Sequence, residues 1–319
     1  MDRTVFQRAF SLIELLLVIS VLSLLVGLLA PALASARRES RRVRCLANLR
    51  SLAAGSAAYS ADDPRDLLLP VHPTADRNTL YDDGFFDFGG ASGAADLWDG
   101  RVGPNSDRAA ATRPLNRVLG LSGGTSSFAP LFHCPSDAGH NAPADYSKGD
   151  GIVWDDSFRR RSVFASVGTS YWGNALKGRL GAADEDPGED PSVPWQSFSV
   201  FLRPSTRIPS TSETVLYMEM PALFDVSFMP GAHGVRFFSY GLAGWHSGGP
   251  RFNFAFCDGR AETAAIPYGW MADVSRAVSP ADYEARKNGV RFDCFPDAPI
   301  VDPPVGADAK PDAGDGGES

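Results

Sequence analysis

The longest run of apolar positions in the chain lies near its N-terminus. Between Phe10 and Leu33 the only polar side chains are those of Ser11, Glu14, Ser20 and Ser23. A run of this length suits a membrane-spanning helix, which needs about 20 residues. The pattern therefore predicts a transmembrane helix over residues 10–33.

The apolar run gives way to a helical periodicity over residues 34–60. Small and apolar residues recur there at steps of three and four positions, which places them on one face of a helix. These residues are Leu46, Leu49, Leu52, Ala53, Ser56 and Tyr59. We expect the membrane helix to continue as an amphipathic helix of about 50 residues and about 75 Å in all. Pro31 should kink it, because proline removes a helical hydrogen bond.

Residues 61–297 carry the patterns of short strands and long loops, which indicate a globular domain. Thr214–Met220 reads as a strand, and Arg251–Ile266 reads as a hairpin with Asp258-Gly259 as its two-residue turn. Two further stretches predict strands, namely Gln196–Leu202 and Val167–Asn174. One long helix with an antiparallel sheet gives an α+β fold.

The charge of the chain is unevenly distributed. The net charge of −8 argues against nucleic-acid binding, and the acidic residues 298–319 predict a disordered tail. Six arginines follow the apolar run: Arg37, Arg38, Arg41, Arg42, Arg44 and Arg50. They could meet anionic headgroups or acidic neighbouring subunits, or they could form a solvated helix face. On the far side of the membrane they would run against the positive-inside tendency.

Glu14 is costly in a simple membrane helix. A carboxylate at the bilayer centre costs about 2.5–3.5 kcal/mol on insertion scales, and less near the interface. An ordinary anchor gains nothing from it, and neither does a signal peptide cut near Ala32-Leu33-Ala34 or Ala34-Ser35-Ala36. If the chain is cut after Ala9, the new amine of Phe10 can pair with Glu14 of a neighbouring subunit. A buried charge requires such a partner.

The stretch from Ala9 to Leu33 resembles the N-terminal methylation motif of type IV pilins and type II secretion pseudopilins. That motif typically reads Gly-Phe-Thr-Leu-Ile-Glu, and Phe10, Leu12, Ile13 and Glu14 match it. The resemblance implies that residues 1–9 are a leader, which prepilin peptidase removes before methylating Phe10. It also implies that Phe10 and Glu14 set the register of subunits in a homo- or hetero-filament, and that the architecture is pilin-like.

A second resemblance covers the rest of the chain. Proteins of planctomycete and verrucomicrobial lineages join this N-terminus to a large domain with three short motifs. The stretches of this chain that are similar to these motifs are Cys45–Arg50 (CLANLR), Cys134–Asp137 (CPSD) and His246–Gly259. In the usual form nine residues separate the histidine from Asp-Gly, whereas eleven do so here. This resemblance implies an architecture and leaves the role of His246, Asp258 and Gly259 undefined.

The four cysteines allow disulfides if the domain is exported. Cys45 could pair with Cys134 and Cys257 with Cys294, or all four could remain free thiols. His246 and Asp258 could be metal ligands or an acid–base pair. We prefer the simpler interpretation, in which His246 caps a turn and Asp258 with Gly259 forms one.

Other candidate sites give weaker signals. The spacing of His133, Cys134 and His140 fits no common zinc pattern. A run of acidic side chains could bind calcium but lacks the EF-hand order: Asp184, Glu185, Asp186, Glu189 and Asp190. No common hydrolase, metalloprotease, P-loop or dinucleotide-binding motif is present. We therefore predict no catalytic residue, no bound metal and no cofactor.

Taken together, the resemblances imply a pseudopilin-like filament subunit of a type II secretion or type IV pilus-like system, and not an enzyme. Its partners would be prepilin peptidase and other pilin or pseudopilin subunits. It would cross the bacterial inner membrane once, with its C-terminal domain in the periplasm. The alternative is an exported or anchored enzyme or carbohydrate-binding protein. Five tryptophans could then line a sugar groove: Trp98, Trp154, Trp172, Trp195 and Trp245.

Overall fold

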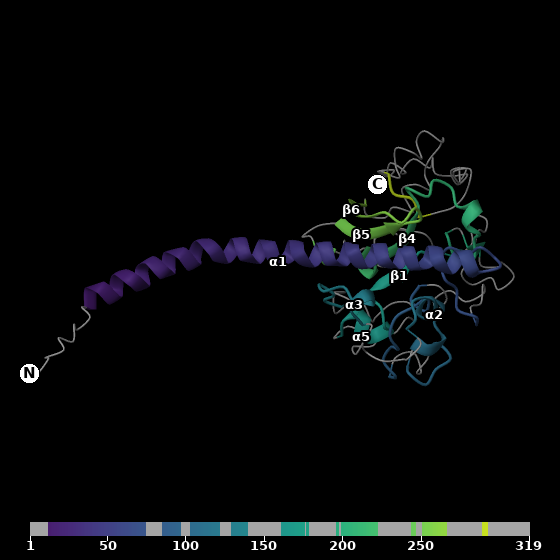
Figure 1. Ribbon diagram of the computed structural model, residues 1–319, viewed down its shortest axis with the longest axis horizontal. Helices are drawn as coiled ribbons and strands as arrows, with labels where there is room; N and C mark the ends of the chain where they lie inside the picture. Colours follow the sequence, from purple (N-terminus) through teal and green to yellow (C-terminus); the bar gives the residue numbers. More distant parts are fainter. Residues whose placement is uncertain are drawn as a thin grey trace, which may run out of the picture.

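A long helix and an antiparallel sheet form the framework of the protein (Figure 1). The computed structural model describes residues 12–74, 85–96, 103–121, 129–139, 161–175, 177–178, 196–197, 199–222, 244–246, 251–266 and 289–292. Helix α1 contacts strands β4, β5 and β6 of the sheet, and it also contacts the short helices α2 and α3. This arrangement confirms the α+β layout.

Helix α1 runs without interruption from Leu12 to Asp62. It passes through Pro31 instead of ending there, and its N-terminal part curves away from its straight C-terminal part (Figure 1). The predicted membrane and amphipathic segments are thus one helix, which is long and apolar enough near its start to cross a membrane. Its buried face contains five of the six residues of the predicted stripe, while Leu46 is half-buried. The buried residues are Cys45, Leu49, Leu52, Ala53, Gly55, Ser56, Tyr59 and Ser60.

The main sheet has four antiparallel strands in the order β1-β4-β5-β6. The strands are β1 (Tyr171–Gly173), β4 (Val215–Glu219), β5 (Arg251–Phe256) and β6 (Ala261–Ala265). A second, two-stranded sheet pairs β2 (Lys177–Gly178) with β3 (Gln196–Ser197). All five residues of β4 are buried; the strand lies between β1 and β5, and α1 contacts it.

The β5–β6 hairpin confirms the predicted strands and corrects the predicted turn. Arg251 pairs with Ala265, and the register continues without a break to Ala255 and Ala261. The amide of Phe256 donates to the carbonyl of Arg260, and Gly259 has φ 86°. These features define a turn over residues 257–259 that closes with a left-handed glycine, and not a two-residue turn.

The other two predicted strands are shorter than expected. Among the described residues of Gln196–Leu202, only β3 is extended, and Val200 and Phe201 are both buried beyond it, where the chain bends and turns. Leu202 has φ 58°, which is incompatible with a strand. In Val167–Asn174 the strand begins only at Tyr171, because Val167 ends helix α5 and Gly168 caps it with φ 87°.

A buried arginine holds together the coil that precedes β1 in the chain. The short elements of this coil are η2 (Ala110–Thr112), α2 (Pro114–Val118), α3 (Ala129–Phe132) and α5 (Val163–Val167). A second 3-10 turn, η5 (Ser205–Arg207), lies between β3 and β4 in the chain. Arg113 donates to the carbonyls of Phe86 (3.1 Å), Gly89 (2.8 Å) and Val167 (2.9 Å). Its complete burial lowers the pKa of the guanidinium to about 10, so it stays charged at neutral pH.

Candidate functional site

Four side chains from distant parts of the sequence meet at the buried face of α1. Cys45 comes from α1, Cys134 from the loop after α3, Glu219 from the end of β4, and His246 from the segment before β5. One donor atom from each lies within 4.8 Å of the others. Cys45, Cys134 and Glu219 are completely buried, and the His246 side chain is 2% exposed. We call these four residues the Cys₂GluHis cluster.

The donor atoms of the cluster converge on one small volume. His246 Nε2 lies 3.1 Å from Cys134 Sγ and 3.2 Å from Glu219 Oε1. Cys45 Sγ lies 3.2 Å from the same carboxylate oxygen. In contrast, His246 Nδ1 and Glu219 Oε2 are buried with no hydrogen-bond partner among the described residues. The polar groups therefore face one another around a common centre.

Burial and mutual proximity shift the protonation of the cluster. Burial raises the pKa of the Cys45 thiol well above its usual range, and the nearby Cys134 and Glu219 raise it further. Burial alone would lower the pKa of His246. Its contacts with Cys45 and Glu219 outweigh that effect and raise the pKa of His246 to about 9. The site thus favours the protonated thiol of Cys45 and the protonated imidazole of His246.

The loop that carries Cys134 is fixed by side chains on both sides of it. Asn48, one helical turn after Cys45, donates to the carbonyls of Pro130 (2.8 Å) and His133 (3.2 Å). The amide of Ser136 donates to Cys134 Sγ at 3.4 Å. The two cysteine motifs are therefore joined by the hydrogen bonds of Asn48, and their unbonded thiols lie within 4.8 Å of each other.

Asp137 closes this loop onto the start of α5. Its Oδ1 accepts hydrogen bonds from the amides of Gly139 (2.9 Å) and Val163 (3.0 Å). Its Oδ2 accepts from the Phe164 amide (2.9 Å) and from the Ser170 hydroxyl (2.6 Å). Because the Ser170 hydroxyl also accepts from the Cys134 amide at 3.0 Å, Asp137 holds the backbone of Cys134 in place.

A chain of hydrogen bonds positions Glu219 from the other side. Asn253 Nδ2 donates to Glu219 Oε1 at 2.8 Å. Thr263 Oγ1 donates to Asn253 Oδ1 at 2.5 Å, and Arg42 of α1 donates to Thr263 Oγ1 at 2.8 Å. Strands β5 and β6 thus fix the carboxylate that β4 supplies.

The structure separates His246 from Asp258, which the sequence paired as candidates. The structure places His246 Nε2 against Cys134 and Glu219, whereas the turn beside Gly248-Gly249 that His246 was expected to cap lies outside the described residues. Asp258 lies beyond the opposite end of β4, where its amide donates to the carbonyl of Thr211. Its Oδ1 accepts from the amide of Arg260 at 2.9 Å, which confirms Asp258 as a turn former beside Gly259.

The structure describes some of the remaining cysteine and metal-ligand candidates, and it does not describe others. Cys45, Cys134 and Cys257 are free thiols in the structure, so the Cys45–Cys134 pair is close but not bonded. The ring of His133 packs against Phe164, with 4.9 Å between the ring centroids. Three predictions lie outside the described residues: Cys294, His140 and the acidic run 184–190.

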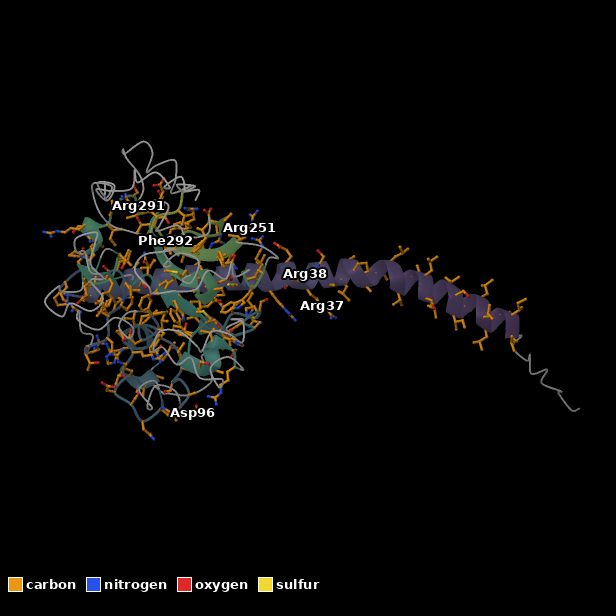
Figure 2. The ribbon with its side chains drawn as sticks, turned by 180° about the vertical axis from the view of Figure 1, so that it is seen from behind. Arg37, Arg38, Asp96, Arg251, Arg291 and Phe292 are labelled. Carbon is orange, nitrogen blue, oxygen red and sulfur yellow. The ribbon has the colours of Figure 1, made fainter. Side chains whose placement is uncertain are left out.

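The N-terminal candidates are described in part. Glu14 lies exposed in the first turn of α1, whereas Ala9 and Phe10 lie outside the described residues. Arg37 and Arg38 lie exposed on α1 just before it enters the globular part (Figure 2). Arg42 pairs with Glu39, and Arg50 donates to the carbonyl of Ala261 at 3.2 Å.

The tryptophan candidates give no sugar groove in the described part of the chain. Trp172 is 4% exposed and packs against Phe85 and Phe86. Trp245 is half-buried, and its indole nitrogen donates to the carbonyl of Gly139 at 3.4 Å. Trp98, Trp154 and Trp195 lie outside the described residues.

Sequence reasoning missed Glu219 as a member of the site. The signal was a single carboxylate in the apolar stretch Val215–Met220, which is unusual for a buried strand.

Comparison of the chain with protein-family models, with curated proteins and with solved structures gives no match.

Proposed function

We propose that the chain is a pseudopilin-like subunit that prepilin peptidase processes and that assembles into a filament through α1. Before assembly, α1 would hold it in the bacterial inner membrane with the globular part in the periplasm. The proposal rests on one observation: every large apolar side chain between Leu12 and Leu33 is exposed, from 46% at Val18 to 80% at Leu12. A surface of this kind requires lipid or neighbouring helices around it.

The dimensions of α1 suit both a bilayer and a helical bundle. The part before Arg42, the first residue to bond the sheet, is about 45 Å long at about 1.5 Å per residue. The hydrocarbon core of a bilayer is about 30 Å thick. We call the part of α1 from Leu12 to Arg41 the exposed arm. The exposed arm can therefore span a membrane and leave the globular part outside it.

The polar side chains of the exposed arm are compatible with surroundings that exclude water. The hydroxyls of Ser20 and Ser23 donate to the carbonyls of Leu16 and Ile19, each at 2.7 Å. These hydroxyls are therefore satisfied within the helix, as lipid or a helix bundle requires. Glu14 is the one ionisable side chain between Leu12 and Leu33. It lies at the head of the arm, where the Phe10 amine of a neighbouring subunit could pair with it.

The test replaces Glu14 and follows insertion and assembly separately. We expect Glu14→Ala to remain in the membrane fraction and to lose cross-linked multimers and sheared filaments, because the neighbouring amine loses its partner. Ser20→Ala, on the same arm, is the matched control and should assemble normally. If Glu14→Ala assembles like the wild type, the arm is only an anchor or signal, and the exported enzyme or carbohydrate-binding protein becomes the better reading.

A further inference from the structure

We propose that the Cys₂GluHis cluster is a structural zinc site that fastens α1 to the globular part. Its ligands are Cys45, Cys134, Glu219 and His246. The inference is independent of the proposed filament, because it rests only on the packed part of the protein. It also replaces the expectation from sequence that the chain binds no metal.

The donor set selects the metal. Two thiolates, one imidazole and one carboxylate are all ligands of Zn²⁺, whereas calcium and magnesium require oxygen ligands. Four protein ligands complete a tetrahedral site and leave no position for a substrate or a water, which is typical of structural zinc. The near-complete burial of all four side chains supports the same role.

The spacing of the donor atoms fits a shared ion. With zinc bonds of about 2.0–2.3 Å, tetrahedral ligands lie about 3.3–3.8 Å from one another. Three contacts in the cluster are 3.1–3.2 Å long, and all four donor atoms lie within 4.8 Å of one another. Small shifts of these side chains would therefore bring them to coordination distance.

Hydrogen bonding alone explains the cluster poorly. Glu219 Oε1 is approached by Cys45 Sγ, His246 Nε2 and Asn253 Nδ2, while Glu219 Oε2 has no partner among the described residues. His246 Nε2 carries at most one proton, yet it faces both Cys134 Sγ and the carboxylate. A divalent cation would satisfy these converging lone pairs together.

The surroundings of the ligands have the form of a supporting shell. Asn253 orients the Glu219 carboxylate, and the Ser136 amide donates to Cys134 Sγ, as outer-shell partners do at metal centres. Asn48 ties α1 to the loop that carries Cys134. The metal would thus link α1, the α3–α5 side and the sheet at one point.

The test measures the metal content of the full chain purified in detergent without added metal or chelator. We expect about one zinc per chain by mass spectrometry of the metal. X-ray absorption at the zinc edge should show two sulfur and two nitrogen or oxygen neighbours. After zinc removal, Co²⁺ should give the absorption bands of a tetrahedral thiolate site. These measurements on the wild-type chain do not depend on whether any variant folds.

Variants assign the ligands. Cys45→Ser, Cys134→Ser and Glu219→Gln should each lose most of the zinc, while Cys257→Ser and His133→Gln should keep it as matched controls. The proposal is overturned if the reduced chain neither carries zinc nor takes up Zn²⁺ or Co²⁺, or if zinc is bound without sulfur neighbours. It is also overturned if intact-mass analysis finds a Cys45–Cys134 disulfide in the native protein.

Discussion

The thiol of Cys45 lies 3.2 Å from Glu219 Oε1, although 174 positions separate the two residues in sequence. This contact joins the helix that leaves the globular part to the strand at the centre of its core. It places a carboxylate, which is normally exposed or paired, beside a thiol in a fully buried site. The packing of α1 on the sheet therefore has a polar centre.

Removal of zinc should destabilise the globular part. Free zinc at 100 times its dissociation constant contributes about 2.7 kcal/mol to the free energy of unfolding. For a domain of this size that corresponds to about 5–10 °C in the melting temperature. We expect a strong chelator to lower the melting temperature of the wild type and of Cys257→Ser by this amount. Cys134→Ser should melt early with or without chelator; an unchanged wild-type melting temperature would contradict the structural role.

The apolar face of α1 should contribute strongly to stability. Leu52 lies on this face of α1 and is completely buried, and Leu52→Ala should lower the free energy of unfolding by about 2–5 kcal/mol. Val43, on the same helix, is 54% exposed, and Val43→Ala should change it by no more than about 0.5 kcal/mol. Chemical denaturation of the full chain in detergent measures both. Equal effects of the two variants would mean that α1 does not pack on the sheet as described.

Gly168 should tolerate no side chain. It has φ 87°, and a Cβ there would lie 1.8 Å from the carbonyl oxygen of Ala91. Gly120 also has a positive φ, of 68°, but no atom lies within 4 Å of its Cβ position. Gly120→Ala should therefore cost only the left-handed backbone penalty of about 1–2 kcal/mol. Gly168→Ala should prevent accumulation of folded protein, as measured by protease resistance; comparable resistance of the two variants would argue against this packing.

Asp66 should contribute a pH-dependent part of the stability. Its carboxylate accepts hydrogen bonds from the hydroxyls of Ser205 (2.6 Å) and Ser60 (2.8 Å), which lower the pKa of Asp66. The stabilisation is complete above the unfolded pKa of about 3.9 and is lost as the pH falls through the lower folded pKa.

Asp66→Asn measures this contribution, because asparagine tolerates the positive φ of 54° at this position. The free energy of unfolding should differ most between variant and wild type near neutral pH. The difference should shrink as the pH falls below about 4. A difference that does not change with pH would show that the carboxylate charge is not responsible.

Local patterns predicted the parts of the fold that local interactions determine. The apolar stripe on α1 and the alternation around Asp258-Gly259 gave one helix and one hairpin with nearly correct ends. The strand predicted over Gln196–Leu202 was wrong at its C-terminal end, because Leu202 adopts a positive φ that the alternating pattern does not reveal. The coil that Arg113 organises has no periodic signal, since a buried guanidinium and backbone carbonyls hold it together.

The Cys₂GluHis cluster could be predicted only in pieces. Cys45, Cys134 and His246 each stood out in a short motif, but their spacing along the chain matches no compact zinc pattern. Their convergence depends on the packing of α1 against β4 and on the loop that Asp137 closes. These contacts are made in three dimensions and leave no periodic trace in the sequence.

The most direct test of the proposed function is the N-terminus of the mature protein, determined by mass spectrometry of the membrane fraction. We predict a chain that begins at N-methylated Phe10, with Glu14 retained at the head of α1. A chain that begins near Ser35 or Arg37 would contradict the proposal, because the exposed arm would then be a removed signal peptide and no filament could form through it.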